Sequence, residues 1–198
     1  MSNRWREVAI SGHEGDESTA RLALASPDPQ TRMLGLGALE RMGALTDHDL
    51  RASAADTEPG VRRRTALLAA KRRAVSVLAL LSDADPTVVE AAAWAAGEQE
   101  TSDDGVIEAL VGLAVDAEDA LVREAAVAAL GAIGDVRGLP AILAGCSDKP
   151  AVRRRAVLAL APFDGPEVAE ALSAALEDRD WQVRQAAEDI APFMNDDA

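Results

Sequence analysis

Residues 117–135 read AEDALVREAAVAALGAIGD, and this order of acidic turn, anchor residue, arginine and alanines occurs six times in the 198-residue chain. The other copies read SPDPQTRMLGLGALERMG from residue 26, DTEPGVRRRTALLAAKR from 56, DADPTVVEAAAWAAGE from 83, SDKPAVRRRAVLALAPFDG from 147 and DRDWQVRQAAEDIAPF from 178. The spacings between successive anchors are 30, 27, 34, 30 and 31 residues, for Thr31, Val61, Val88, Val122, Val152 and Val183. This period predicts a solenoid, in which each unit buries its apolar face only against its neighbours.

Each copy predicts the second helix of a two-helix unit, because a shorter amphipathic segment precedes it. The expected pairs are 16–25 with 29–42, 46–55 with 59–71, 73–82 with 86–98, 103–116 with 120–133, 137–146 with 150–161, and 166–177 with 181–193. Asp103 is a predicted N-cap. Prolines suit the first turn of the second helices, at positions 29, 59, 86 and 150. Glycines suit the helix ends, at positions 43, 97, 134 and 165.

The apolar residues of the second helices follow a 3.6-residue period. With the anchor counted as position 0, positions 0, +4, +7 and +8 form one stripe of a helix. The stripe contains Val122, Ala126, Ala129 and Leu130 in the fourth copy and Val152, Ala156, Ala159 and Leu160 in the fifth. We expect these residues to form the core between neighbouring helices.

The repeated features resemble HEAT repeats: an acid three residues before the anchor, a Val-Arg pair, and AxxALGxIGD at 126–135. The short repeat is similar to the HEAT-like variety first associated with phycobilisome lyases. The resemblance covers residues 16–194 and implies an all-α fold, a right-handed α-solenoid (α-α superhelix) of about six two-helix HEAT-like repeats. Residues 1–15 are then an N-terminal extension or cap, and residues 195–198 an acidic tail.

The resemblance also implies a ladder of ion pairs between neighbouring repeats. In this family the acid before the anchor and the arginine after it typically link one repeat to the next. The implied acids are Asp28, Glu58, Asp85, Asp119 and Asp180, and the implied arginines are Arg32, Arg62, Arg123, Arg153 and Arg184. The pattern breaks at Val89, which replaces an arginine, and at Lys149, which reverses the charge of the acid.

Positions +2, +6 and +9 lie opposite the core stripe and line the concave surface of such solenoids. Trp and Arg dominate binding hot spots, so we predict a groove around Trp94 in which arginines contact acidic groups and glutamates contact basic ones. The alternative is that Trp94 packs against a bulky neighbour within a curved stack. The candidate partner-binding residues are Met33, Arg63, Leu67, Glu90, Trp94, Glu124, Arg154 and Leu158.

The arginine triplets, Trp181 and Cys146 have mainly structural interpretations. In the triplets 62–64 and 153–155, only the middle arginines point toward the predicted groove, because adjacent helical residues fan around the axis. Trp181 occupies the slot that is proline in other copies, and we expect it to pack the last inter-helix turn. Cys146 is expected to be a small buried hydrophobic residue.

The charge balance argues against a nucleic-acid partner. The formal net charge is −14, whereas a phosphate backbone is bound through clustered Lys and Arg. Lys71 and Lys149 are the only lysines, against eighteen arginines. Two explanations of this acidic, lysine-poor and alanine-rich composition are open: a halophilic protein from a salt-rich cytoplasm, in which carboxylates hold water, or GC-rich codon usage.

Metal, redox and membrane chemistry receive no support from the sequence. Cys146 is the single cysteine, which excludes an internal disulfide and a multi-cysteine zinc site. His13 and His48 are too few and too scattered for a metal cluster. The N-terminus lacks the apolar segment of a signal peptide, and no apolar run approaches the ~20 residues that span a bilayer. We therefore expect a soluble, cytoplasmic protein without a cofactor, metal or membrane partner.

Catalysis receives equally little support, because the sequence shows no nucleophile beside a base and no glycine-rich phosphate loop. The sequence favours a non-catalytic interaction scaffold or adaptor that binds a protein or peptide on its concave face. By analogy, such an adaptor serves in a signalling or taxis complex. The alternative is a bilin or tetrapyrrole lyase-like protein, or one that handles the pigment, because the family includes bilin lyases.

Overall fold

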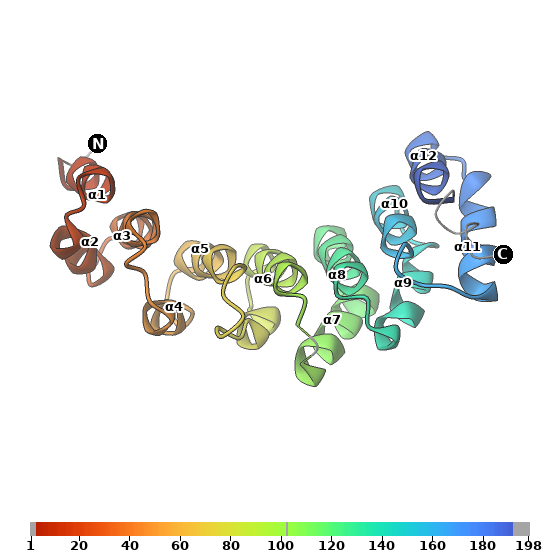
Figure 1. Ribbon diagram of the computed structural model, residues 1–198, viewed down its shortest axis with the longest axis horizontal. Coiled ribbons are helices and arrows are strands. Elements are labelled where there is room, and N and C mark those ends of the chain that lie inside the picture. Colours follow the sequence, from red (N-terminus) through yellow and green to blue (C-terminus); the bar gives the residue numbers. More distant parts are fainter. Residues whose placement is uncertain (1–2, 102, 192–198) are drawn as a thin grey trace. The chain divides into compact units, whose positions relative to one another are not determined.

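The computed structural model describes residues 3–101 and 103–191, which form twelve α-helices and two short 3₁₀-helices without a strand (Figure 1). The predicted all-α class is confirmed. The chain divides after Ser76 into two compact units. Each unit consists of helix pairs arranged in two layers, as the repeat predicts.

The N-terminal unit contains three helices that pack side by side, α1, α3 and α5, and two helices that cover them. Helix α1 lies along α3 so closely that a Cβ on Gly12 would stand 2.8 Å from Cα of Ala38. Residues before the first predicted repeat therefore supply a packed helix. The elements are α1 (Asn3–Glu14), α2 (Glu17–Leu24), α3 (Pro29–Met42), α4 (Asp47–Ser53) and α5 (Pro59–Ala69).

The C-terminal unit continues the pattern, with α6, α8, α10 and α12 packed in sequence in one layer (Figure 1). In the other layer, α7 packs against both η1 and α9. The elements are η1 (Leu78–Ser82), α6 (Pro86–Gln99), α7 (Asp104–Asp116), α8 (Ala120–Ile133), η2 (Val136–Gly138), α9 (Leu139–Gly145), α10 (Pro150–Ala159), α11 (Pro166–Leu176) and α12 (Trp181–Ile190).

The predicted helix starts are confirmed. Asp103 caps α7 by accepting the backbone N–H of Val106, and prolines occupy the first turn of α3, α5, α6 and α10. Helices α3 and α8 end at Gly43 and Gly134, both in the left-handed conformation at φ 69°, which glycine adopts without a Cβ penalty.

Two of the four expected glycine helix ends are wrong. Gly97 lies inside α6, and the left-handed residue that ends this helix is Glu100 at φ 46°. A Cβ on Gly97 would stand 3.1 Å from Cα of Ala129, so this glycine serves close helix packing. Gly165 precedes α11 rather than ending α10.

The expected helix 73–82 is also wrong, because only Leu78–Ser82 is helical there and its form is 3₁₀. Contacts with earlier helices hold the preceding segment. Arg51 donates to the carbonyl of Ala74, and Arg72 donates to the carbonyl of Leu45 and pairs with Glu40 at 2.7 Å. These bonds hold residues 72–74 against α3, α4 and the loop between them, and favour a turn over a helix.

The predicted core stripe is confirmed, because all eight of its residues in the fourth and fifth copies are at most 6% exposed. Position +9, by contrast, does not line an open surface in the third and fourth copies. Its glycines, Gly97 and Gly131, lie against alanines of the next second helix. A Cβ on Gly131 would stand 2.5 Å from Cβ of Ala159, so the helices approach each other where both side chains are small.

Candidate functional site

Three of the arginines after the anchors, Arg32, Arg123 and Arg153, join neighbouring repeats, and this leaves them unavailable to a partner. Arg153 donates from Nε and Nη2 to the two carboxylate oxygens of Asp178, both at 2.8 Å, and from Nη1 to the carbonyl of Asp148. Arg123 binds Asp148 in the same two-pronged way at 2.6 and 2.8 Å. Arg32 binds Asp56 likewise at 2.7 and 2.6 Å. Such planar, bidentate, charge-assisted pairs are strong and directional.

The structure corrects which acids form this ladder. The acid three residues before the anchor is an N-cap: the carboxylates of Asp28, Asp119 and Asp180 accept backbone N–H groups of their own helices. The arginine of the preceding repeat instead reaches the acid four or five residues before the anchor, as in Asp148 and Asp178. That residue begins the turn and faces the previous helix, whereas the capping residue faces its own helix axis.

The protonation states fit this role. Hydrogen bonding to Arg123 lowers the pKa of Asp148 below its usual 3.8, with burial opposing the shift. Hydrogen bonding to Arg153 lowers the pKa of Asp178 in the same way. The pKa of each arginine is raised by its aspartate, again against burial. Both partners of each pair are therefore charged at neutral pH.

At the joint between α6 and α8, the ladder is replaced by apolar packing. Val89 stands where the arginine would be, and Ala117 stands five residues before the next anchor, where Asp178 stands in the last copy. Val89 is 5% exposed, and Gly97 meets Ala129 in the same interface. Glu118, four residues before the anchor, is exposed, so the loss of the arginine leaves no unpaired buried charge at this joint.

The three arginines of a triplet point in three different directions. The first, Arg153, points forward to the next repeat, as described above. The third points backward: Arg155 pairs with Glu124 of α8 at 3.6 Å, and Nη2 of Arg64 lies 3.2 Å from where a Cβ of Gly37 would be. Only the middle residues remain for a partner, and of these Arg63 is exposed whereas Arg154 is half-buried.

In the C-terminal unit, the candidate binding residues lie on three successive helices, α6, α8 and α10. Trp94 is 44% exposed, so it is not packed away against a bulky neighbour, which was the alternative. Glu90 and Leu158 are half-buried. Glu124 is less available than its position indicates, because it faces Arg155 and its side chain is 21% exposed.

In the N-terminal unit, the candidates lie on α3 and α5. Met33 is half-buried, and its Sδ lies 3.5 Å from where a Cβ of Gly60 would be. Leu67 is half-buried beside the exposed Arg63. Met33 therefore packs across the joint between α3 and α5 as well as facing outward.

Two side chains are more exposed than their sequence interpretation predicts. Trp181 is 65% exposed at the start of α12, so most of its side chain is not packed. Cys146 is half-buried and lines a cavity between α9 and α11 that no repeat motif indicates. The sequence feature that could have indicated this cavity is the pair of small residues on α11, Ala171 and Ala174.

Stacked two-helix units joined by an arginine–aspartate ladder define a helical-repeat protein. The HEAT-repeat sequence profile matches residues 74–151 and 143–190, and the chain belongs to the HEAT repeat family. An X-ray structure of the Escherichia coli protein YibA is similar, with a TM-score of 0.66 and 17% identity over 94% of this chain and 73% of that one.

A crystal structure of an engineered protein is also similar, with a TM-score of 0.63 and 20% identity over 90% of this chain and 98% of that one. At these identities the likeness concerns the fold alone. A search of curated proteins found no match. HEAT repeats typically act as scaffolds for protein interactions and are generally non-catalytic. None of the described helices has the length and apolar content needed to cross a membrane.

Proposed function

We propose that this protein is a non-catalytic scaffold or adaptor that binds a protein or peptide through the outward-facing side chains of its second helices. The observation that carries the proposal is Trp94, which is 44% exposed on α6. An exposed indole on a rigid helix offers a large contact area at small entropic cost, which explains the enrichment of Trp in binding hot spots.

The surroundings of Trp94 support a mixed, mainly polar contact. Glu90 lies one helical turn before Trp94, and Arg154 and Leu158 occupy the corresponding positions on α10. The acidic side at α6 and the basic side at α10 favour a partner segment with an apolar residue between charges of both signs. Such complementarity sets orientation and specificity more than affinity.

The ladder supports the proposed binding residues because it removes the other arginines from consideration. Arg123 and Arg153 are engaged by aspartates, and Arg155 faces Glu124. The side chains that vary between repeats and reach solvent are the ones left for recognition. In the N-terminal unit, Arg63 and Leu67 fill the same role in the proposal.

The test uses the full chain as bait in extracts of its native cells at their own salt concentration. Trp94→Ala should lose one specific protein that the wild type retains, with Kd raised about thirtyfold for a hot spot worth about 2 kcal/mol. Trp181→Ala is the matched control, because this tryptophan is more exposed but lies at the start of α12.

Equal recovery of the partner by both variants would contradict the proposed surface. Absorbance spectroscopy with added biliverdin tests the alternative. A stable visible band from a bound bilin, together with failure to retain any specific protein, would replace the scaffold by a pigment-handling function.

A further inference from the structure

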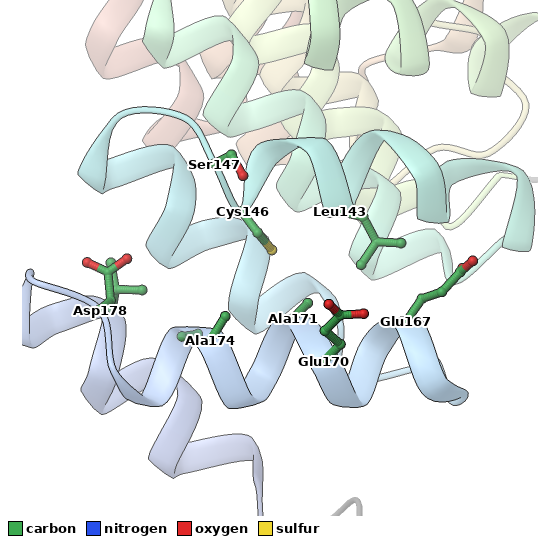
Figure 2. A pocket seen from close by; sticks show the side chains of 10 residues that line it. Leu143, Cys146, Ser147, Glu167, Glu170, Ala171, Ala174 and Asp178 are labelled. Atoms are coloured by element: carbon green, nitrogen blue, oxygen red, sulfur yellow. The ribbon is translucent and has the colours of Figure 1, made fainter.

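A cavity of about 300 Å³ opens between α9 and α11, in the layer of first helices. Figure 2 shows Leu143 and Cys146 on α9 and the residue after it facing Ala171 and Ala174 of α11 across this space. The cavity involves neither Trp94 nor any other candidate residue of the proposed function. Its volume is at the lower end of ligand pockets, about 300–1,000 Å³.

Small side chains on both walls create the cavity. On α11 the residues that face it are spaced as one helical stripe, in which Ala171 and Ala174 occupy the middle. Helix α9 is only seven residues long and ends at Gly145, which places Cys146 and Ser147 at the opposite wall. The alanine side chains in the middle of the α11 wall are too short to fill the gap.

The lining is apolar in the middle. Leu143, Ala171, Ala174 and Val183 contribute hydrocarbon surface. Burial raises the pKa of the Cys146 thiol to about 11. The thiol is therefore neutral at physiological pH and behaves as a small apolar group.

The rim is acidic. Glu167 and Glu170 project from α11 three residues apart, so they lie on one side of the helix, and both are exposed (Figure 2). Asp178 lies at the other end of the cavity, where its carboxylate is held by Arg153 at 2.8 Å. The acids available to a bound group are therefore Glu167 and Glu170.

We propose that this cavity is a second docking site, which receives a single long basic side chain, arginine or lysine, from a partner polypeptide. The aliphatic stem lies against Cys146, Leu143 and Ala171, and the cationic group meets Glu167 and Glu170. Long basic side chains combine an apolar stem with a charged head, which matches an apolar floor with an acidic rim. A purely apolar residue would leave the rim without a counter-charge, and an acidic one would be repelled.

The test uses a short capped alanine peptide with a central Leu-Arg pair, and its Leu-Glu counterpart, at about 0.1 M salt, where the Debye length is about 10 Å. Backbone amide shifts of the ¹⁵N-labelled full chain locate the binding. We expect saturable shifts in residues 143–147 and 167–178, with the Glu peptide at least about tenfold weaker, because like charges meet at the rim. Alkylation of Cys146 should slow when the Arg peptide is bound.

Two variants separate the cavity from general acidity. Glu167→Lys with Glu170→Lys should abolish binding of the Arg peptide, and Ala174→Leu should do so by filling the cavity without a charge change. Glu108→Lys with Glu118→Lys is the matched control, because both residues are exposed and neither lines the cavity. This control pair should retain binding.

The proposal is overturned by equal affinity for the two peptides, by shifts spread over the acidic surface, or by binding that survives the charge reversal. Trp94→Ala should leave this peptide binding unchanged. The cavity proposal and the Trp94 surface proposal are therefore tested independently of each other.

Discussion

Substitution of Arg153 tests the corrected ladder most directly. Its side chain is 7% exposed and that of Asp178 is 14% exposed. Arg153→Met removes two hydrogen bonds to the carboxylate and one to the carbonyl of Asp148, while the methionine retains most of the apolar packing. Removing one partner of a buried pair costs about 3–5 kcal/mol. The partial exposure of Asp178 reduces our expectation to about 2–4 kcal/mol, because water can solvate the freed carboxylate.

A double-mutant cycle identifies the partner. Asp178→Asn and Asp180→Asn are matched changes two residues apart. Each asparagine retains a side-chain oxygen that can accept the local backbone N–H, which comes from residue 180 in the first case and from Gln182 in the second. We expect Arg153→Met to couple to Asp178→Asn by about 1–3 kcal/mol, as residues in one salt-bridge network do. Coupling to Asp180→Asn should stay within about 0.5 kcal/mol.

The assay is urea unfolding followed by circular dichroism, with hydrogen exchange of the α12 amides as a local readout of the last joint. The reasoning is refuted if the cycle with Asp180 gives coupling as large as the cycle with Asp178. In that case the capping acid, rather than the acid that begins the turn, would be the ladder partner.

Three further predictions concern packing, pH and the thiol. Gly131→Ala should destabilise the chain by about 1–3 kcal/mol in urea unfolding, because its Cβ would stand 2.5 Å from that of Ala159. Gly112→Ala in α7 meets nothing within 4 Å and should be neutral or stabilising. The free-energy difference between wild type and Asp178→Asn should shrink as pH falls below 3.8, since the folded pKa of Asp178 is lowered; a constant difference down to pH 2 would contradict the pairing. Alkylation of Cys146 should show a pH midpoint near 11 when folded and near 9.0 in urea, and equal midpoints would show that the thiol is not buried.

The helix pairs and their core stripe were predictable because both depend on local periodicity. Val122 and Leu130 lie on one helical stripe regardless of what the neighbouring repeat does. Asp103 and the prolines act within a single turn, which is why the helix starts were predicted correctly. The helix 73–82 was not, because its first residues are held by contacts with distant parts of the chain: Arg51 donates to the carbonyl of Ala74, and the adjoining Arg72 donates to the carbonyl of Leu45.

The candidate surface was predictable only in part. The helical wheel places Trp94 opposite the core, and the structure leaves it exposed, but the wheel does not reveal that Arg155 reaches back to Glu124. Such a contact depends on the offset between neighbouring helices. That offset is set where Gly131 meets Ala159, residues 28 positions apart in sequence.

The sequence by itself determined a HEAT-type repeat: its period, its two-helix units and the apolar face of each helix, because these follow from spacing along one chain segment. Only the tertiary structure decided that Arg153 pairs with Asp178 rather than with Asp180, and that a cavity remains between α9 and α11. Both depend on distances between separate helices. Those distances are fixed by how closely the small residues of neighbouring repeats approach one another.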